Sequence, residues 1–221
     1  MVLLIHHSSS SFSRKARIQM AEKKMLAVLR EEEPWNPSED LYKLNPAGTL
    51  PIFLSDGHSI SGTYAITEYL EEFIREVRLF PDDIKARAEA RRLVEWFDVK
   101  FYEEVYKKIV MEKVHKRFSK GLAPDSKILK IGLNNLNFHM EYLDWLAERN
   151  HYLAGDLFTL ADIAAAAHLS VLDYLGDVPW ESYKNAKLWY SKIKSRPSFK
   201  DILKDTIRGI LPSKHYANLD F

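Results

Sequence analysis

The feature that most constrains the fold is a change of pattern near residue 80, where β-rich segments stop and every later periodic segment is helical. Residues 2–7 form an apolar run typical of a strand buried on both faces. Residues 13–24 have the spacing of an amphipathic helix, and residues 25–31 are again β-rich. The helix is long enough for the crossover that joins two parallel strands.

Four further elements complete this part of the chain. We expect a short helix at residues 40–44 and a strand at 50–54 that Pro51 opens. Asp56-Gly57 predicts a hairpin to a strand at 58–60, and Thr63 is placed to cap a following helix. The order βαβαββα over residues 1–78 predicts a small α/β domain with a mixed sheet.

The remainder is predicted to be a linker (79–86), an all-α domain (87–205) and a tail (206–221). Helices are expected at 83–118, at 126–149, from Thr159 onwards, at 183–194 and at 198–204. Thr159 and Asp162 have the spacing of a capping box, which gives them a structural role.

Composition excludes several classes of protein. The net charge of +1 offers no electrostatic basis for nucleic-acid binding. The absence of cysteine removes disulfides and thiolate metal sites, and suits a reducing compartment. His6 and His7 are adjacent on a strand and point to opposite faces, so no metal site is predicted. With no signal peptide and no run of about 20 apolar residues, we expect a cytoplasmic protein without a membrane partner.

Two sequence features could carry chemistry. In the serine run 8–11, Ser10 is the candidate hydrogen-bond donor to a bound thiolate at the start of a helix, with Ser11 or Ser13 as its cap. The alternative is turn and cap chemistry alone. Pro51 is either a simple strand start or follows a cis peptide bond after Leu50, and the surrounding pattern favours the cis bond.

Three segments follow one another in a characteristic order. They are the serine turn with the following Arg14-Lys15-Ala16-Arg17, then Asn45-Pro46-Ala47-Gly48-Thr49-Leu50-Pro51, and then Tyr64-Ala65-Ile66-Thr67-Glu68-Tyr69-Leu70. This order resembles that of a cytosolic glutathione S-transferase. Nearly the whole chain is covered. The resemblance implies a thioredoxin-like domain, a helical domain and a homodimer. It also implies that Ser10 faces the glutathione sulfur and that Leu50 and Pro51 hold the cysteinyl backbone.

At one position the chain departs from this family. Members usually have an acidic residue or glutamine, followed by serine, where this chain has Gly62-Thr63. Thr63 can still bind a carboxylate, whereas Gly62 offers no partner for the ammonium group of glutathione. Losing one charge-assisted hydrogen bond lowers affinity by roughly ten- to a hundredfold. We therefore expect a weakened glutathione site.

The C-terminal Leu219-Asp220-Phe221, together with Gly62-Thr63 and Arg196-Pro197-Ser198-Phe199, resembles a bacterial cell-division branch of this superfamily. This resemblance implies binding to FtsZ filaments. The candidate partner-binding residues are Trp35, His215, Tyr216, Asp220 and Phe221. The alternative for the tail is packing against its own domain through Ile210, Leu211 and Tyr216, and Trp35 could equally pack on the helical domain.

The sequence thus favours a homodimer that binds FtsZ filaments and requires no cofactor, with glutathione as a weak ligand. The alternative is an active glutathione S-transferase in which Ser10 stabilises the thiolate of glutathione.

Overall fold

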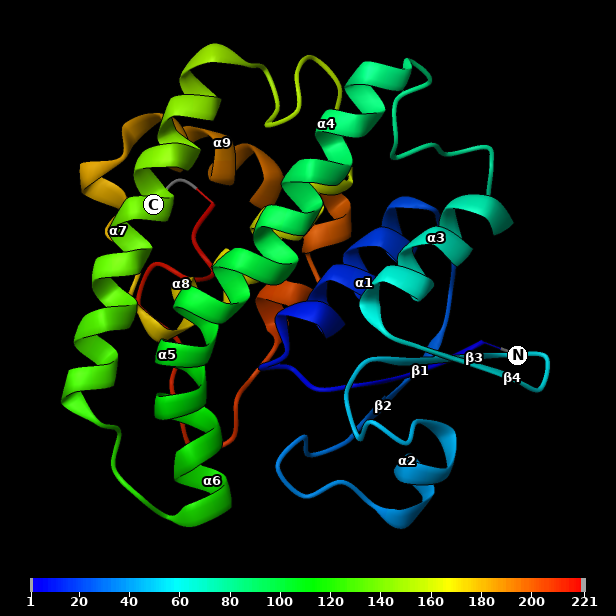
Figure 1. Ribbon diagram of the computed structural model, residues 1–221, viewed down its shortest axis with the longest axis vertical. Helices are drawn as coiled ribbons and strands as arrows, with labels where there is room; N and C mark the ends of the chain where they lie inside the picture. Colours follow the sequence, from blue (N-terminus) through cyan, green and yellow to red (C-terminus); the bar gives the residue numbers. More distant parts are fainter. Residues whose placement is uncertain (1, 220–221) are drawn as a thin grey trace.

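The computed structural model describes residues 2–219, and a small mixed-sheet domain is followed by a helical domain, as predicted (Figure 1). The first domain contains β1 (Leu3–His6), α1 (Ser11–Glu22), β2 (Val28–Glu31), α2 (Glu39–Leu44), β3 (Ile52–Ser55), β4 (His58–Ser61) and α3 (Thr63–Phe73). This order confirms the predicted βαβαββα pattern.

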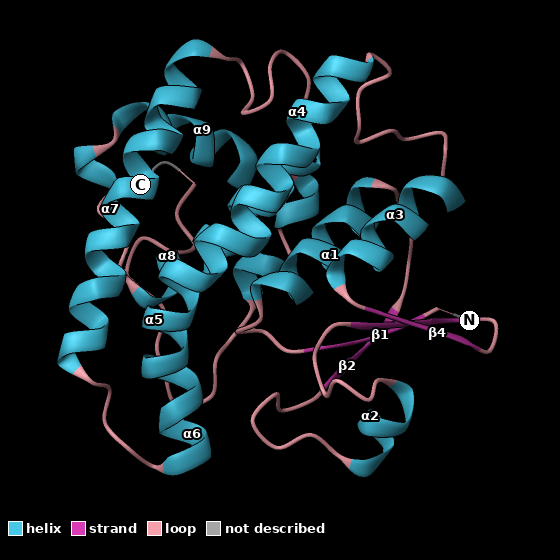
Figure 2. Cartoon of the chain, in the orientation of Figure 1, coloured by secondary structure: helices cyan, strands magenta, loops and turns pink. Residues whose placement is uncertain are grey.

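The four strands form one mixed sheet in the order β2-β1-β3-β4. Strand β1 is parallel to β2 and antiparallel to β3, and β3 and β4 form the predicted hairpin. Helices α1 and α3 cover one face of the sheet and α2 covers the other (Figure 2). At the hairpin, Asp56 and Gly57 both have positive φ (49° and 82°), as a tight two-residue turn requires.

Strand β2 begins three residues later than predicted. Lys24 has a φ of 57°, and the Met25 N–H donates to the Met20 carbonyl at 2.9 Å. The end of α1 therefore curls over residues 24 and 25, and pairing with β1 begins only at Val28.

The second domain contains α4 (Ile84–Glu95), η1 (Trp96–Tyr106), α5 (Lys107–Val110), η2 (Met111–His115), α6 (Lys116–Lys120), α7 (Ser126–Arg149), α8 (Leu160–Leu175), η3 (Trp180–Ser182), α9 (Lys184–Lys194), η4 (Pro197–Phe199) and η5 (Ile202–Lys204). The segments from α4 to α6 follow one another without a break, with wide π-type turns in η1 and η2. They form the long helix predicted at 83–118, and α7 has the predicted bounds.

The helix predicted at 198–204 is wrong. This stretch forms two single 3₁₀ turns, η4 and η5, in which the Lys200 N–H donates to the Pro197 carbonyl and the Asp205 N–H to the Ile202 carbonyl. Contacts with distant side chains favour these turns, because the Asp201 and Ile202 carbonyls accept hydrogen bonds from Arg17 and Tyr216.

Helix α8 lies at the centre of the molecule, and its residues from Leu160 to Tyr174 are buried. The predicted capping box at its start is confirmed. Asp162 accepts hydrogen bonds from the Thr159 N–H (2.9 Å), the Leu153 N–H (3.0 Å) and the Trp189 indole (2.9 Å). Burial raises the pKa of the Asp162 carboxyl, and the hydrogen bonds act against that rise. The side chain therefore joins α8 to the preceding loop and to α9.

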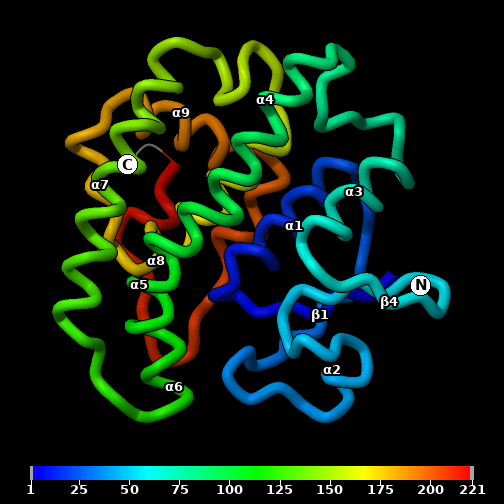
Figure 3. The backbone as a smooth tube through the Cα atoms, in the orientation of Figure 1, coloured from blue at the N-terminus to red at the C-terminus, as the bar shows by residue number. Residues whose placement is uncertain are grey.

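The tail packs on its own domain, and Figure 3 shows it running back among the helices. Ile207 and Tyr216 are buried in the helical core, and the half-buried Ile210 packs against it. Leu211, an expected anchor, is instead 89% exposed. Among residues 2–219, no helix combines the length and apolar character needed to cross a membrane.

Candidate functional site

The turn between β1 and α1 places Ser10 at the start of α1. The Ser10 hydroxyl oxygen accepts a hydrogen bond from the Ser13 N–H at 3.2 Å, so Ser10 is itself the helix cap. The expectation that Ser11 or Ser13 caps the helix is wrong. Ser11 and Ser13 already lie inside α1, where their backbone is helical.

Three contacts from outside the turn hold it in place. The Ser8 N–H and hydroxyl both donate to the Glu31 carboxylate, at 3.2 and 2.7 Å. The Arg14 guanidinium donates to the Ser8 carbonyl at 2.8 Å, and the Tyr106 hydroxyl donates to the Ser9 carbonyl at 2.5 Å. Burial would raise the pKa of Glu31, but the hydrogen bonds from Ser8 outweigh it and lower the pKa. The turn is thus fixed from β2, α1 and the helical domain.

The peptide bond between Leu50 and Pro51 is cis, as the sequence pattern favoured. Leu50 lines a cavity together with Ser10, whereas Pro51 is buried. The start of α3 differs from the prediction, because its N-cap is Gly62 and not Thr63. Gly62 has a φ of 89°, which favours glycine, and makes no side-chain cap. Gly62 and Thr63 also line the cavity.

The structure therefore brings four predicted residues together around a cavity of about 500 Å³ between the domains. The rest of its lining was not predicted. The sheet domain adds Phe12, Pro34, Gly48 and Thr49, and the helical domain adds Tyr102, Tyr106, Lys107, Met111 and His115. Tyr102 and Tyr106 each follow a buried apolar residue, Phe101 or Val105, within the helix predicted at 83–118, and that spacing was the available signal.

The cavity combines an aromatic wall with a cationic edge. The rings of Tyr102 and Tyr106 stack with their centroids 4.9 Å apart, and the centroid of the Phe12 ring lies 4.7 Å from that of Tyr102. Burial, aided by neighbouring His7, lowers the pKa of His115 to about 4, so its ring is neutral at pH 7. Lys107 is the charged side chain in the described lining, which includes no carboxylate. The cavity suits a ligand with apolar and anionic parts.

Trp35 packs on the helical domain, the alternative that the sequence left open. Its ring stacks on Phe118 with the centroids 5.1 Å apart. It also makes T-shaped contacts with His7 and His115, at centroid distances of 4.9 and 5.5 Å. The ring is only half-buried, and its indole N–H donates to Glu33. Trp35 thus packs against His115 of the cavity lining without lining the cavity itself, and part of its surface stays accessible.

The predicted partner residues of the tail differ in how far they are exposed. Tyr216 is 1% exposed, so its ring is not presented to a partner. Its hydroxyl accepts a hydrogen bond from Arg14 and donates one to the Ile202 carbonyl. His215 is half-buried and contacts Asp173 at 2.8 Å. Asp220 and Phe221 lie outside the described residues.

A thioredoxin-like domain with a serine turn, a cis-proline step and an interdomain cavity defines the two-domain architecture of glutathione transferases. Residues 9–72 match the family described as Glutathione S-transferase, N-terminal domain, and residues 129–197 match Glutathione S-transferase, C-terminal domain. The chain belongs to the glutathione S-transferase superfamily.

Within that superfamily, FtsZ-localized protein A of Caulobacter vibrioides is 42% identical over 222 residues, which cover 99% of this chain and 97% of the relative. The solved structure described as FzlA from C. crescentus has a TM-score of 0.97 at 42% identity and covers 100% of this chain and 99% of its own. A structure described as a glutathione S-transferase from Rhodospirillum rubrum has a TM-score of 0.97 at 47% identity, with both chains fully covered.

Proposed function

We propose that this protein is a dimeric, cytoplasmic regulator of bacterial cell division that binds FtsZ filaments and holds glutathione only weakly. The observation that carries the proposal is the 42% identity, over almost the full length of both chains, with a protein described as FtsZ-localized. The Rhodospirillum rubrum structure, at 47% identity, is instead described as a glutathione S-transferase. The chemistry of the cavity is therefore needed to distinguish the two functions.

The chemistry of the cavity supports a weak glutathione site. Glutathione has one ammonium group and two carboxylates. The described lining offers Lys107 and the uncapped start of α3 to carboxylates, but no carboxylate to the ammonium group. The Gly62 position leaves open space where a side chain would stand. Calorimetric titration with reduced glutathione, up to several millimolar, tests this directly, and saturation in the low micromolar range would contradict it.

The face that α4–η1 and α7 share supports a dimer. Phe138 and Trp145 on α7 are 54% and 49% exposed. Trp96 and Tyr142 bridge the two helices with ring centroids 4.6 Å apart, and Lys100 extends over the rings of Trp96 and Phe138. Exposed aromatic residues grouped in this way are typical of an interface between proteins. We propose that a second copy of the chain covers this face.

The dimer is tested by Phe138→Asp, since an unpaired carboxylate at the centre of an interface opposes association. We expect the variant to sediment as a monomer in analytical ultracentrifugation while the unaltered protein sediments as a dimer. The matched control is Leu188→Asp on α9, where the leucine is equally apolar and 71% exposed. A monomeric unaltered protein, or two variants that both remain dimeric, would contradict the proposed interface.

Residues 217–219 and the accessible surface of Trp35 are the proposed contacts to FtsZ. Residues 217–219 are exposed and follow directly on the buried Tyr216, which anchors them to the fold. A deletion placed after Pro212 would remove this anchor and disturb Arg14. A deletion of residues 217–221 keeps the anchor and removes only the segment offered to the partner.

Co-sedimentation with polymerised FtsZ tests this proposal. We expect the full chain to pellet with filaments, and the chain without residues 217–221 to stay in the supernatant with unchanged thermal stability. Leu211→Ser removes an exposed apolar side chain from the tail before the anchor, and this control should still pellet. Absence of the full chain from the pellet would contradict filament binding itself. Normal pelleting of the truncated chain would exclude the tail as the contact.

Ser10 favours the second candidate, an active glutathione transferase. Among the described residues, its hydroxyl accepts a hydrogen bond from Ser13 and donates none, so its proton can point into the cavity. The positive end of the α1 dipole adds to this effect. A thiol held there would have a lowered pKa, because both groups stabilise the thiolate.

Conjugation of glutathione to 1-chloro-2,4-dinitrobenzene tests the transferase function. Ser10→Ala should lower the rate by at least about tenfold, as expected for losing one donor to a developing anion. Ser11→Ala is the matched control, since Ser11 is adjacent but does not line the cavity. Equal rates for Ser10→Ala and the unaltered protein would exclude Ser10 as the thiolate donor. A rate no faster than the uncatalysed one would exclude the transferase.

A further inference from the structure

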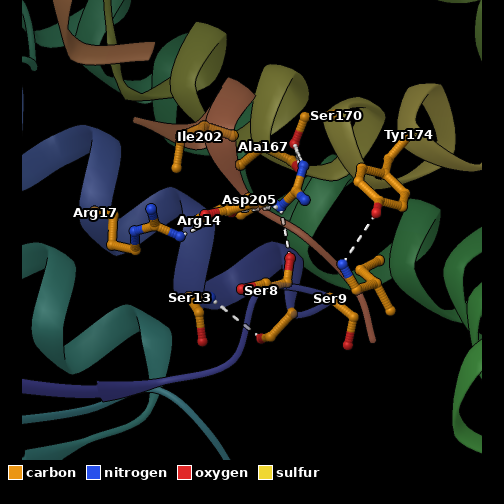
Figure 4. Close-up of polar contacts among 12 residues, drawn as sticks. Ser8, Ser9, Ser13, Arg14, Arg17, Ala167, Ser170, Tyr174, Ile202 and Asp205 are labelled. Carbon is orange, nitrogen blue, oxygen red and sulfur yellow. Dashed lines mark hydrogen bonds and ion pairs between the residues drawn. The ribbon is translucent and has the colours of Figure 1, made fainter. Parts of the chain in front are cut away.

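A single buried guanidinium lies between the serine turn and the C-terminal tail. Arg14 is fully buried although it sits only four residues after Ser10. Figure 4 shows its side chain leaving α1 and extending to α8, where Ser170 lies. Two parts of the protein that are distant in sequence therefore meet at one charged group.

On the side of the turn, Arg14 Nε donates to the Ser8 carbonyl at 2.8 Å. Ser8 begins the turn that ends with Ser10, and the amides of Ser9 and Ser10 are hydrogen-bonded to His7. The Ser9 N–H bonds His7 Nδ1, and the Ser10 N–H bonds the His7 carbonyl. The hydrogen bond from Arg14, together with those of Glu31 and Tyr106, thus fixes the position of the Ser10 hydroxyl in the cavity.

On the side of the tail, Arg14 Nη1 donates to the Tyr216 hydroxyl and to Ser170 Oγ, both at 2.9 Å. The Tyr216 hydroxyl then donates to the Ile202 carbonyl at 2.8 Å. Asp205, at 3.4 Å from Nε, supplies the nearby negative charge. Tyr216 is thus attached both to Arg14 and to the segment that leads into the tail.

The Arg14 site has no surplus of partners. Among the described residues, Nη2 is buried and has no hydrogen-bond partner. A buried charge is tolerated only where hydrogen bonds replace its hydration, so each remaining contact is needed. If Tyr216 moves away, the guanidinium has to shift toward new acceptors, and its bond to the Ser8 carbonyl is disturbed.

We propose that Arg14 is a positioning residue that couples the serine turn of the cavity to the C-terminal tail. A ligand that orders the turn then strengthens anchoring of the tail, and by linkage a partner bound to the tail changes ligand affinity by the same factor. The coupling is a property of the free protein and does not depend on the identity of the ligand or of the partner.

Two tyrosines provide a matched pair of variants. The Tyr216 hydroxyl accepts from Arg14 and donates to the Ile202 carbonyl. The Tyr174 hydroxyl accepts from the Ile207 N–H at 3.0 Å and donates to the Ile210 carbonyl at 2.7 Å. Both rings are 1% exposed, and they contact each other edge to face at 5.0 Å. Each phenylalanine variant therefore loses two hydrogen bonds that join the tail to the rest of the protein, but only Tyr216→Phe affects Arg14.

The experiment is amide hydrogen exchange of the intact protein, resolved for residues 8–14 and 207–216, together with thermal unfolding. We expect similar losses of global stability in the two variants. Exchange in the turn at residues 8–10 should rise about tenfold or more in Tyr216→Phe, the effect of weakening a hydrogen bond to a charged group. In Tyr174→Phe the turn should exchange as in the unaltered protein, while the tail exchanges faster.

A purely structural role for Arg14 would give the same turn exchange in both variants, and that result would overturn the proposal. Unchanged turn exchange in Tyr216→Phe would overturn it as well. A second arm uses 5 mM reduced glutathione as the probe. If glutathione slows exchange of the turn, it should also slow exchange at residues 207–216, and an effect confined to the turn would contradict the coupling. If glutathione has no effect on the turn, the proposed weak binding fails, whereas the comparison of variants still decides the role of Arg14.

Discussion

The Gly62 position offers the sharpest test of the cavity's specificity. Replacing Gly62 by Glu places a carboxylate at the start of α3, where the described lining has none for an ammonium group. A Cβ at this position meets no atom within 4 Å, so the side chain has space. Its backbone has a φ of 89°, so any residue with a side chain is strained there.

These two effects have different consequences. The strain costs about 1–3 kcal/mol of folding free energy. It is present with and without ligand, so it lowers stability and leaves affinity unchanged. One new charge-assisted hydrogen bond contributes about 1.5–3 kcal/mol, which raises glutathione affinity by roughly ten- to a hundredfold. For a chain of this length, the strain lowers Tm by roughly 2–4 °C per kcal/mol.

The assay is calorimetric titration with reduced glutathione, and Gly62→Ala is the matched control. Alanine introduces the same strain without a carboxylate, so both variants should unfold at the same reduced Tm. Only Gly62→Glu should bind glutathione more tightly than the unaltered protein. Equal glutathione affinity in the two variants would refute the argument that the missing side chain weakens the site.

Three further predictions concern the scaffold. Asp162→Ala leaves the Leu153 and Trp189 N–H groups unpaired, so the free energy of unfolding in urea should fall by about 3–5 kcal/mol. A fall below about 1 kcal/mol would contradict the role of the capping box. Gly132→Ala puts a Cβ 2.7 Å from the Cβ of Lys108, where α7 packs on α5. The free energy of unfolding in the same assay should fall by about 1 kcal/mol or more, and a more stable variant would contradict this crowding. Burial lowers the pKa of His115 from 6.5 to about 4, so on acidification the unfolded chain takes up this proton before the folded chain does. Folding is therefore most favourable above pH 6.5, and the free energy of unfolding falls by about 3 kcal/mol as the pH drops toward 4. His115→Phe should reduce the slope of stability over that pH range, to which His6, whose pKa burial also lowers to about 4, still contributes. An unchanged slope would contradict the assignment.

Features that depend on local sequence could be predicted. The Asp56-Gly57 hairpin, the bounds of α7 and the capping box at Thr159 each depend on residues within a few positions of one another. The cis bond before Pro51 needed more, namely the order of strands and helices around it. The helical spacing of residues 198–204 was misleading, because this stretch forms two 3₁₀ turns whose carbonyls bind the distant Arg17 and Tyr216 side chains.

The helical half of the cavity could not be predicted, because packing between distant segments creates it. Tyr106 reaches the Ser9 carbonyl across 97 positions of sequence, and Arg14 reaches Tyr216 across 202. The apolar character of Tyr216 indicated an anchor, but nothing in the neighbouring sequence indicates that its hydroxyl contacts a buried arginine. The sequence therefore indicated four residues of the lining, all in the sheet domain, and missed every residue that the helical domain contributes.

Helix α1 belongs to two hydrophobic cores at once. Ala16 and Met20 pack against the sheet with α3, whereas Ile18 is part of the core of the helical domain. If either domain unfolded alone, α1 would expose one of these faces and leave Arg14 and Lys15 without their partners. The two domains are therefore not independent folding units. Calorimetry should record a single cooperative transition, and two resolved transitions would contradict this.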